Sequence, residues 1–226
     1  MTRTAALLLT ALVPAVFAPP AALAFVPNLN QKQAEKAIER GKQEAASKEH
    51  GFIVKNHVLY ASKDPLTIAE GGGEVDAVIV GTPTLMLTYH SYLEAFQKHK
   101  FDSKIAAPLI HSLNDSIRFI VYAHAPSAKT EDQDFLSKFH DFEFKTAAGK
   151  TLTPAGMKVF GPGKDYFSVA GQGREFRWLG TDTVAFSLAG LKGASASDLS
   201  SLKGTLSFKD STGRAYSFDV DLGQYE

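Results

Sequence analysis

The sequence predicts a mainly β fold, α+β overall: an antiparallel β-sandwich, immunoglobulin-like or related, with an N-terminal strand–helix accessory region. From Ser116 onward, short runs rich in β-branched and aromatic residues recur at a spacing of about 8–12 residues, with glycine, proline and aspartate clusters between them. Apolar and polar residues alternate within several runs, as in "FHDFEFKT" at 139–146. A strong helical pattern precedes this β-rich region.

The N-terminus has the three parts of a secretory signal peptide. Arg3 supplies a positive charge, residues 5–18 form an apolar run, and 22–24 (Ala-Leu-Ala) match an A-x-A cleavage site. The apolar run is too short to span a bilayer, and a proline interrupts it. We therefore expect cleavage after Ala24 and export to the periplasm or the extracellular space, with no transmembrane segment in the mature chain.

Composition excludes several kinds of partner and chemistry. The chain has 24 basic and 24 acidic residues, so no overall charge attracts nucleic acid or anionic lipid, although a local patch stays possible. We expect no nucleic-acid partner. The chain has no cysteine, which excludes disulfides, thiolate catalysis and Cys-ligated zinc and leaves stability to packing alone.

The segment before the β-rich region divides into parts of different character. Residues 31–50 are rich in Ala, Lys and Glu, but their apolar face is thin and Gly41 weakens a helix. We expect a solvated helix or a partly ordered linker there, or else a helix that docks on a partner. The expected organisation is a signal peptide (1–24), a helical or partly ordered leader (25–50), a strand–helix accessory region (51–115) and a β-sandwich domain (116–226).

The accessory region contains the strongest helical pattern of the mature chain. Strands are expected at 51–60 and 74–81, and Thr82 and Pro83 then form a typical helix start. We expect the helix to end near 98–100 and to pack one apolar stripe on the sheet. That stripe consists of Leu85, Tyr89, Tyr92 and Phe96.

The β-rich region offers one firm local signal. The segments 204–210 and 214–222 flank Asp210-Ser211-Thr212-Gly213, which predicts a β-hairpin. Gly161-Pro162-Gly163 predicts a turn between two strands. Trp178, the single tryptophan, has the large apolar area that anchors a sandwich core.

No catalytic motif is present. The segment 161–165 lacks the first glycine and the closing Ser/Thr of a phosphate-binding loop, and the chain has neither G-x-S-x-G nor H-E-x-x-H. The sequence therefore predicts no catalytic residues and no cofactor.

The nearest approach to a metal site combines histidines with an acidic loop. The candidate ligands are His124, His140, Asp132 and Asp134. On a strand, His140 points away from the carboxylates that flank Phe142, and the loop lacks the spacing of a calcium motif. Packed or surface histidines and a solvated loop are the alternative interpretation.

These observations favour a non-enzymatic binding or interaction module of the periplasm or cell envelope, with an unknown protein or envelope ligand as partner. The alternative is an exported hydrolase or metal-binding protein whose site is assembled from dispersed histidines and carboxylates. An exposed aromatic patch would favour binding, whereas a histidine and a carboxylate at hydrogen-bond distance in a cleft would favour the enzyme.

Overall fold

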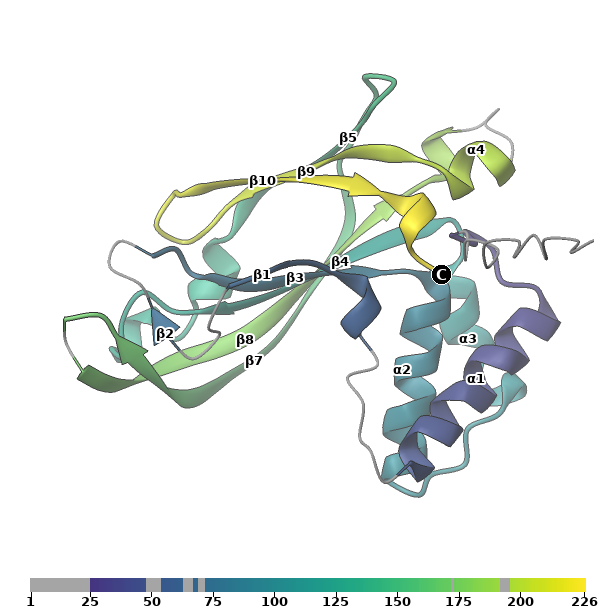
Figure 1. Ribbon diagram of the computed structural model, residues 1–226, viewed down its shortest axis with the longest axis horizontal. Helices are drawn as coiled ribbons and strands as arrows, with labels where there is room; N and C mark the ends of the chain where they lie inside the picture. Colours follow the sequence, from purple (N-terminus) through teal and green to yellow (C-terminus); the bar gives the residue numbers. More distant parts are fainter. Residues whose placement is uncertain (1–24, 48–53, 63–66, 69–71, 172, 192–195) are drawn as a thin grey trace, which may run out of the picture.

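Two β-sheets and a group of helices at one end of them make up the protein in the computed structural model (Figure 1). The structure describes residues 25–226 except 48–53, 63–66, 69–71, 172 and 192–195. The predicted signal peptide at 1–24 therefore lies outside the described residues. The mainly β prediction is confirmed. The finer assignment, an immunoglobulin-like sandwich, stays a prediction.

The larger sheet has six strands in the order β1-β3-β4-β8-β7-β2. Its strands are β1 (Val58–Ala61), β2 (Thr67–Ile68), β3 (Val75–Gly81), β4 (Ser116–His124), β7 (Pro154–Val169) and β8 (Gly173–Ser187). Neighbours pair antiparallel, except that β2 runs parallel to β7. Because β3 pairs with β4, the strand of the accessory region is a member of this sheet rather than a layer packed on it.

The smaller sheet has four strands in the order β10-β9-β5-β6. Its strands are β5 (His140–Thr146), β6 (Thr151–Leu152), β9 (Lys203–Lys209) and β10 (Ala215–Asp221). The predicted hairpin is confirmed, since β9 pairs with β10 and Phe208 lies opposite Tyr216. Gly213 in the connecting loop has φ +85°, a conformation that glycine adopts without steric cost.

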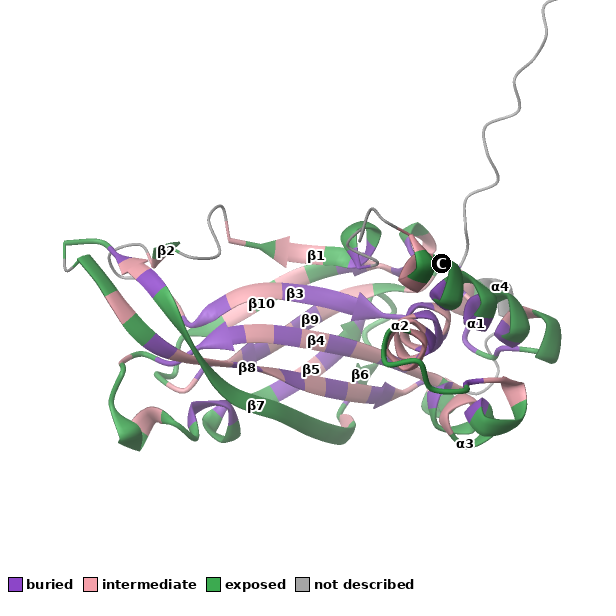
Figure 2. Ribbon diagram, turned by 90° about the horizontal axis from the view of Figure 1, so that it is seen from below, coloured by how far each residue is buried: buried purple, intermediate pink, exposed green. Residues whose placement is uncertain are grey.

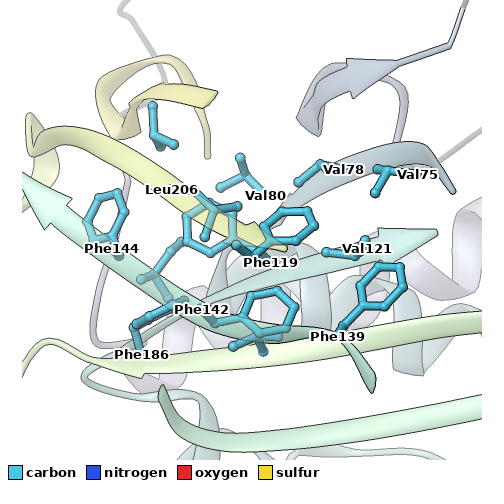
Figure 3. Packing of buried hydrophobic residues seen from close by; sticks show 14 of the residues in the cluster. Val75, Val78, Val80, Phe119, Val121, Phe139, Phe142, Phe144, Phe186 and Leu206 are labelled. Atoms are coloured by element: carbon cyan, nitrogen blue, oxygen red, sulfur yellow. The ribbon is translucent and has the colours of Figure 1, made fainter. Parts of the chain in front are cut away.

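The main hydrophobic core lies between the two sheets (Figure 3). Alternation along β4 buries Ile117, Phe119 and Val121, each fully inaccessible. The Phe119 ring lies 5.7 Å from that of Phe144 on the smaller sheet and 5.9 Å from that of Phe186 on β8. Such tilted and edge-on aromatic contacts stabilise the stacking of one sheet on the other.

Helices gather at the end of the sheets where β3 leads into α2 and α3 leads into β4 (Figures 1 and 2). The helices are α1 (Gln31–Ala46), α2 (Pro83–Phe96), α3 (Ser103–Leu113) and α4 (Ala196–Ser200). Short 3₁₀ turns are η1 (Lys55–His57), η2 (Thr130–Asp132), η3 (Phe135–Lys138), η4 (Ala189–Leu191) and η5 (Leu222–Gln224). None of the described helices is long and apolar enough to cross a membrane.

α1 is packed rather than solvated, which corrects the expectation for this segment. Its thin face of small residues allows a close approach to α2. A Cβ at Gly41 would lie 2.3 Å from the carbonyl oxygen of Thr88, and the Ser91 hydroxyl donates to the Ile38 carbonyl at 2.6 Å. Gly41 therefore permits the helix contact rather than weakening the helix.

α2 begins as predicted, with Thr82 as N-cap and Pro83 in its first turn, but it ends at Phe96. The expected buried stripe is wrong beyond Leu85, because contact with α1 buries Leu87, Thr88 and Ser91 instead. The rings of Tyr89, Tyr92 and Phe96 stack on one another along the helix, and Phe96 is 60% exposed.

The Gly161-Pro162-Gly163 segment is not a turn between strands. It lies inside β7, where the register with β8 shifts between Phe160 and Gly163. Such a shift is a β-bulge, which strands accommodate without ending. Two long strands, β7 and β8, therefore replace the shorter strands that the glycine and proline clusters predict in this part of the chain.

Candidate functional site

The β7–β8 hairpin carries the largest exposed apolar side chains of the larger sheet. Every residue from 155 to 166 of β7 is exposed (Figure 2). Tyr166 is 53% exposed and Phe176 on β8 is 44% exposed. Met157, Val159 and Phe160 are exposed to a similar degree. Apolar side chains gathered on one exposed element are typical of interaction surfaces.

Strand pairing assigns the side chains of the hairpin to two faces, because residues directly opposite each other lie on the same face. One face carries the pairs Lys164–Trp178, Tyr166–Phe176 and Ser168–Arg174. This is the face that buries Val184 and Phe186 further along β8. We call its five aromatic and cationic residues the hairpin strip: Lys164, Tyr166, Arg174, Phe176 and Trp178.

Contacts within the strip hold its side chains together. The ring centroids of Tyr166 and Phe176 lie 3.7 Å apart. The Lys164 ammonium lies 3.9 Å from the centre of the Trp178 ring, a cation–π contact. Trp178 Nε1 donates to the Lys129 carbonyl at 2.9 Å. Trp178 is only partly buried at the border of the main core, so it is not the central anchor that the sequence predicts.

Within the span of the strip, the carboxylates of the hairpin lie on the face opposite the strip, together with a cation. Asp165 and Glu175 belong to the opposite face, where they pair in register with Arg177 and Phe167. Arg177 forms an ion pair with Glu175 and donates to the Ala125 carbonyl at 3.2 Å. Within the described residues, no ion pair involves the two cations of the strip. The strip therefore presents positive charge and aromatic rings without a carboxylate.

A cavity of about 540 Å³ lies beside the part of β7 that precedes the strip. It lies between β7 and the segment that contains η2 and η3. Leu136, Val159 and Pro162 supply its apolar lining, and Glu131 and Asp134 add acidic side chains on the side of η2 and η3. Val159 pairs with Asp182 and so lies on the same face as the strip. The cavity thus extends the exposed apolar surface along β7.

Asp182 is the most unusual ionisable group of this face. It is fully buried between Val121 and Val159 in the sheet, and neither carboxylate oxygen has a hydrogen-bond partner. Burial raises the pKa of Asp182 to about 6. Sequence reasoning missed it because a single acid in the run "TDTVAFSL" gives no indication that its face is covered.

On the other face of the sheet, a bulge in β3 brings a carboxylate to a histidine. The register between β3 and β4 shifts at Asp76, and Asp76 Oδ1 then lies 2.8 Å from His124 Nδ1. His124 is 5% exposed, and its ring lies 5.2 Å from that of Phe167. Burial raises the pKa of Asp76, and the hydrogen bond and charge of His124 partly oppose that rise. Such a pair can orient an imidazole for proton transfer.

A second buried acidic group joins the two sheets. Glu74 accepts hydrogen bonds from the Ser211 backbone at 2.7 Å and from its hydroxyl at 2.5 Å. Asp210 accepts from the backbone of Thr212 and from the hydroxyl of Tyr216. Burial raises the pKa of Glu74. These bonds fasten the β9–β10 loop to the start of β3, which is a structural role.

The predicted metal ligands make separate contacts. The partners are Asp76 for His124, the Lys138 carbonyl for His140, Ser127 for Asp132 and the Lys138 ammonium for Asp134. In the part of the chain that the structure describes, no three histidine or acidic side chains form a group that could hold a metal ion.

Comparisons of the chain with protein-family models, with curated proteins and with solved structures gave no match. The sequence did not indicate that the aromatic side chains of the strip are exposed. Alternation predicts the face on which a side chain lies, but not whether another layer covers that face.

Proposed function

We propose that this protein is an exported, non-enzymatic binding module of the periplasm or cell envelope, and that it binds its partner through the hairpin strip. The single observation that carries the proposal is the exposed pair Tyr166–Phe176 beside Trp178. Aromatic side chains supply large contact area at low entropic cost and dominate the energetics of interfaces.

The position of the strip supports recognition by a preformed surface. β8 pairs along its length with β7 and, from Leu179 onward, also with β4, so the strip residues of β8 are held by pairing with β7. A strand paired in this way holds its side chains in place before a partner arrives. Little ordering entropy is then lost on binding, which favours affinity.

Export rests on the signal-peptide pattern of residues 1–24. Cleavage after Ala24 would retain Phe25, whose ring is 1% exposed and belongs to the main core. N-terminal sequencing of the protein isolated from its host should therefore start at Phe25. A protein that retains its first 24 residues in the cytoplasm would contradict the export proposal.

Site-specific crosslinking in the producing cell tests the binding proposal. A photoreactive phenylalanine analogue placed at Phe176 should give a discrete crosslinked species, and the same analogue at Gln97, exposed beyond α2, should not. Equal labelling at both positions, or none at either in folded protein, would contradict the proposal.

The Asp76–His124 pair favours a second candidate, a hydrolase that uses His124 as a proton-transfer group. Esterase activity on a generic nitrophenyl ester that is lost in His124→Gln, but kept in His111→Gln at an exposed position of α3, would support this candidate. Under the binding proposal, both variants leave the ester hydrolysis rate at that of buffer.

A further inference from the structure

The hairpin strip lies on a part of the molecule that is remote from the helices. The turn between β7 and β8 is at the opposite end of the larger sheet from α1, α2 and α3 (Figure 1). From Arg174 to Trp178 the strip spans five residues of an extended strand, about 13 Å from the first to the last at the usual rise.

The chemistry of the strip combines aromatic rings with cations. Tyrosine and tryptophan prefer the boundary between water and hydrocarbon, where the ring lies in an apolar layer and the polar atom stays hydrated. Lys164 and Arg174 would meet phosphate groups at the same level.

The position of the hairpin's carboxylates favours one face of the hairpin for an anionic partner. Asp165 and Glu175 lie on the opposite face, where an anionic surface would repel them. The strip carries cations only. The chain as a whole has equal numbers of acidic and basic residues, so the attraction is local and its direction is fixed by strand alternation.

We infer that the hairpin strip docks on an anionic lipid surface. The inference rests on the proposed binding function of the same strip and names its partner. The aromatic residues Tyr166, Phe176 and Trp178 enter the interfacial layer, and Lys164 and Arg174 contact lipid phosphates.

Trp178 makes the inference directly measurable, because it is the only tryptophan and lies within the strip. The full chain is titrated with vesicles of phosphatidylcholine alone and of phosphatidylcholine mixed with phosphatidylglycerol. We expect the Trp178 emission to shift to shorter wavelength, and its quenching by acrylamide to fall, with the mixed vesicles only. Added salt should reverse both changes, since exposed charge contacts are screened.

A charge-reversal pair supplies the matched comparison. Lys164→Glu with Arg174→Glu should weaken partitioning into the mixed vesicles at least about thirty-fold, since each cation contributes about 1 kcal/mol and reversal adds repulsion. Lys32→Glu with Lys42→Glu makes the same charge change on exposed positions of α1 and should partition like the unaltered chain. Both double variants still contain residues 1–24. A loss of vesicle partitioning that occurs only in Lys164→Glu with Arg174→Glu is therefore due to the strip. Far-UV circular dichroism confirms that each variant is folded.

The outcomes separate the lipid inference from the proposed binding function. An unchanged Trp178 signal with mixed vesicles, or a strip variant that partitions normally, overturns the lipid inference. A Trp178 response to soluble polyglutamate but not to vesicles also overturns it, in favour of an acidic macromolecule. Where the lipid inference is overturned but position 176 still crosslinks to a protein, the proposed binding function stands. Where position 176 crosslinks to no protein either, the lipid inference and the binding function both fail.

Discussion

At the scale of single residues, Asp182 couples the stability of the protein to pH. Its unfolded pKa lies near 3.8, and burial without a partner raises the folded value to about 6. The folded state therefore binds this proton more tightly than the unfolded chain does. Stability falls as the pH rises from about 4 to 6, by at most about 3 kcal/mol, and this contribution is constant above that range.

The substitution Asp182→Asn replaces the titrating carboxyl group and so removes its contribution to the pH dependence of stability. Glu74 and Asp76 also have raised pKa values and keep their own contribution, so the difference between variant and unaltered chain isolates Asp182. We expect the variant to lose less stability between about pH 4 and 7, measured as the urea midpoint at each pH. Asp219→Asn, at an exposed position of β10, is the control. Parallel pH profiles for Asp182→Asn and the unaltered chain would show that the Asp182 carboxyl titrates normally.

The sequence identifies side chains that carry chemistry more readily than it identifies their environment. His124 is recognisable as a candidate from its type alone, but its partner Asp76 is not. A β-bulge turns the Asp76 carboxylate toward a strand that follows 40 residues later, and bulges have no sequence signature here. Likewise "EFRWLG" shows aromatic alternation that is typical of a core, although Phe176 is exposed.

At the scale of elements, the contact between α1 and α2 depends on the missing side chain of Gly41. Gly41→Ala would place a methyl group 2.3 Å from the Thr88 carbonyl oxygen and 2.7 Å from the Ser91 side chain. The helices must separate, which costs roughly 1–3 kcal/mol. The free energy of unfolding in urea should fall accordingly.

Helix propensity alone predicts that Gly41→Ala raises stability, because alanine favours a helix more than glycine does. In a solvated helix, the substitution would stabilise by up to about 1 kcal/mol. Lys42→Ala, at the next and exposed position, controls for propensity and should change stability little. A more stable Gly41→Ala variant would mean that α1 does not pack on α2 as described.

Elements that are specified by neighbouring residues could be predicted from the sequence. Elements that depend on pairing with strands distant in the sequence could not. The β9–β10 hairpin and the start of α2 are specified by residues within one turn, such as Gly213 and Thr82. Gly161-Pro162-Gly163 carries an equally strong local turn signal. There, pairing with β8 on both sides of the bulge overrides it, and β8 is distant in sequence from the start of β7.

At the scale of the whole molecule, the larger sheet draws strands from both sides of residue 116. β1 and β3 precede residue 116, yet they extend the sheet that contains β4, β8 and β7. Val78 and Val80 of β3 lie in the main core with Phe119 and Phe144 (Figure 3). The expected division at residue 116 falls between two hydrogen-bonded strands, so we expect the core to form only when both segments are present.

Unfolding of the full chain should therefore be a single cooperative transition. Trp178 fluorescence reports the β7–β8 end of the sheet, and far-UV circular dichroism at 222 nm is dominated by the helices at the other end. We expect the two signals to give the same urea midpoint, as coincident transitions by different probes require for two-state unfolding. A fragment of residues 116–226 should lack a cooperative transition, because it exposes the β4 edge that β3 covers and leaves Phe119 without Val80. Separate midpoints for the two probes, or a fragment that folds with the full chain's near-UV spectrum, would instead establish residues 116–226 as an independent domain.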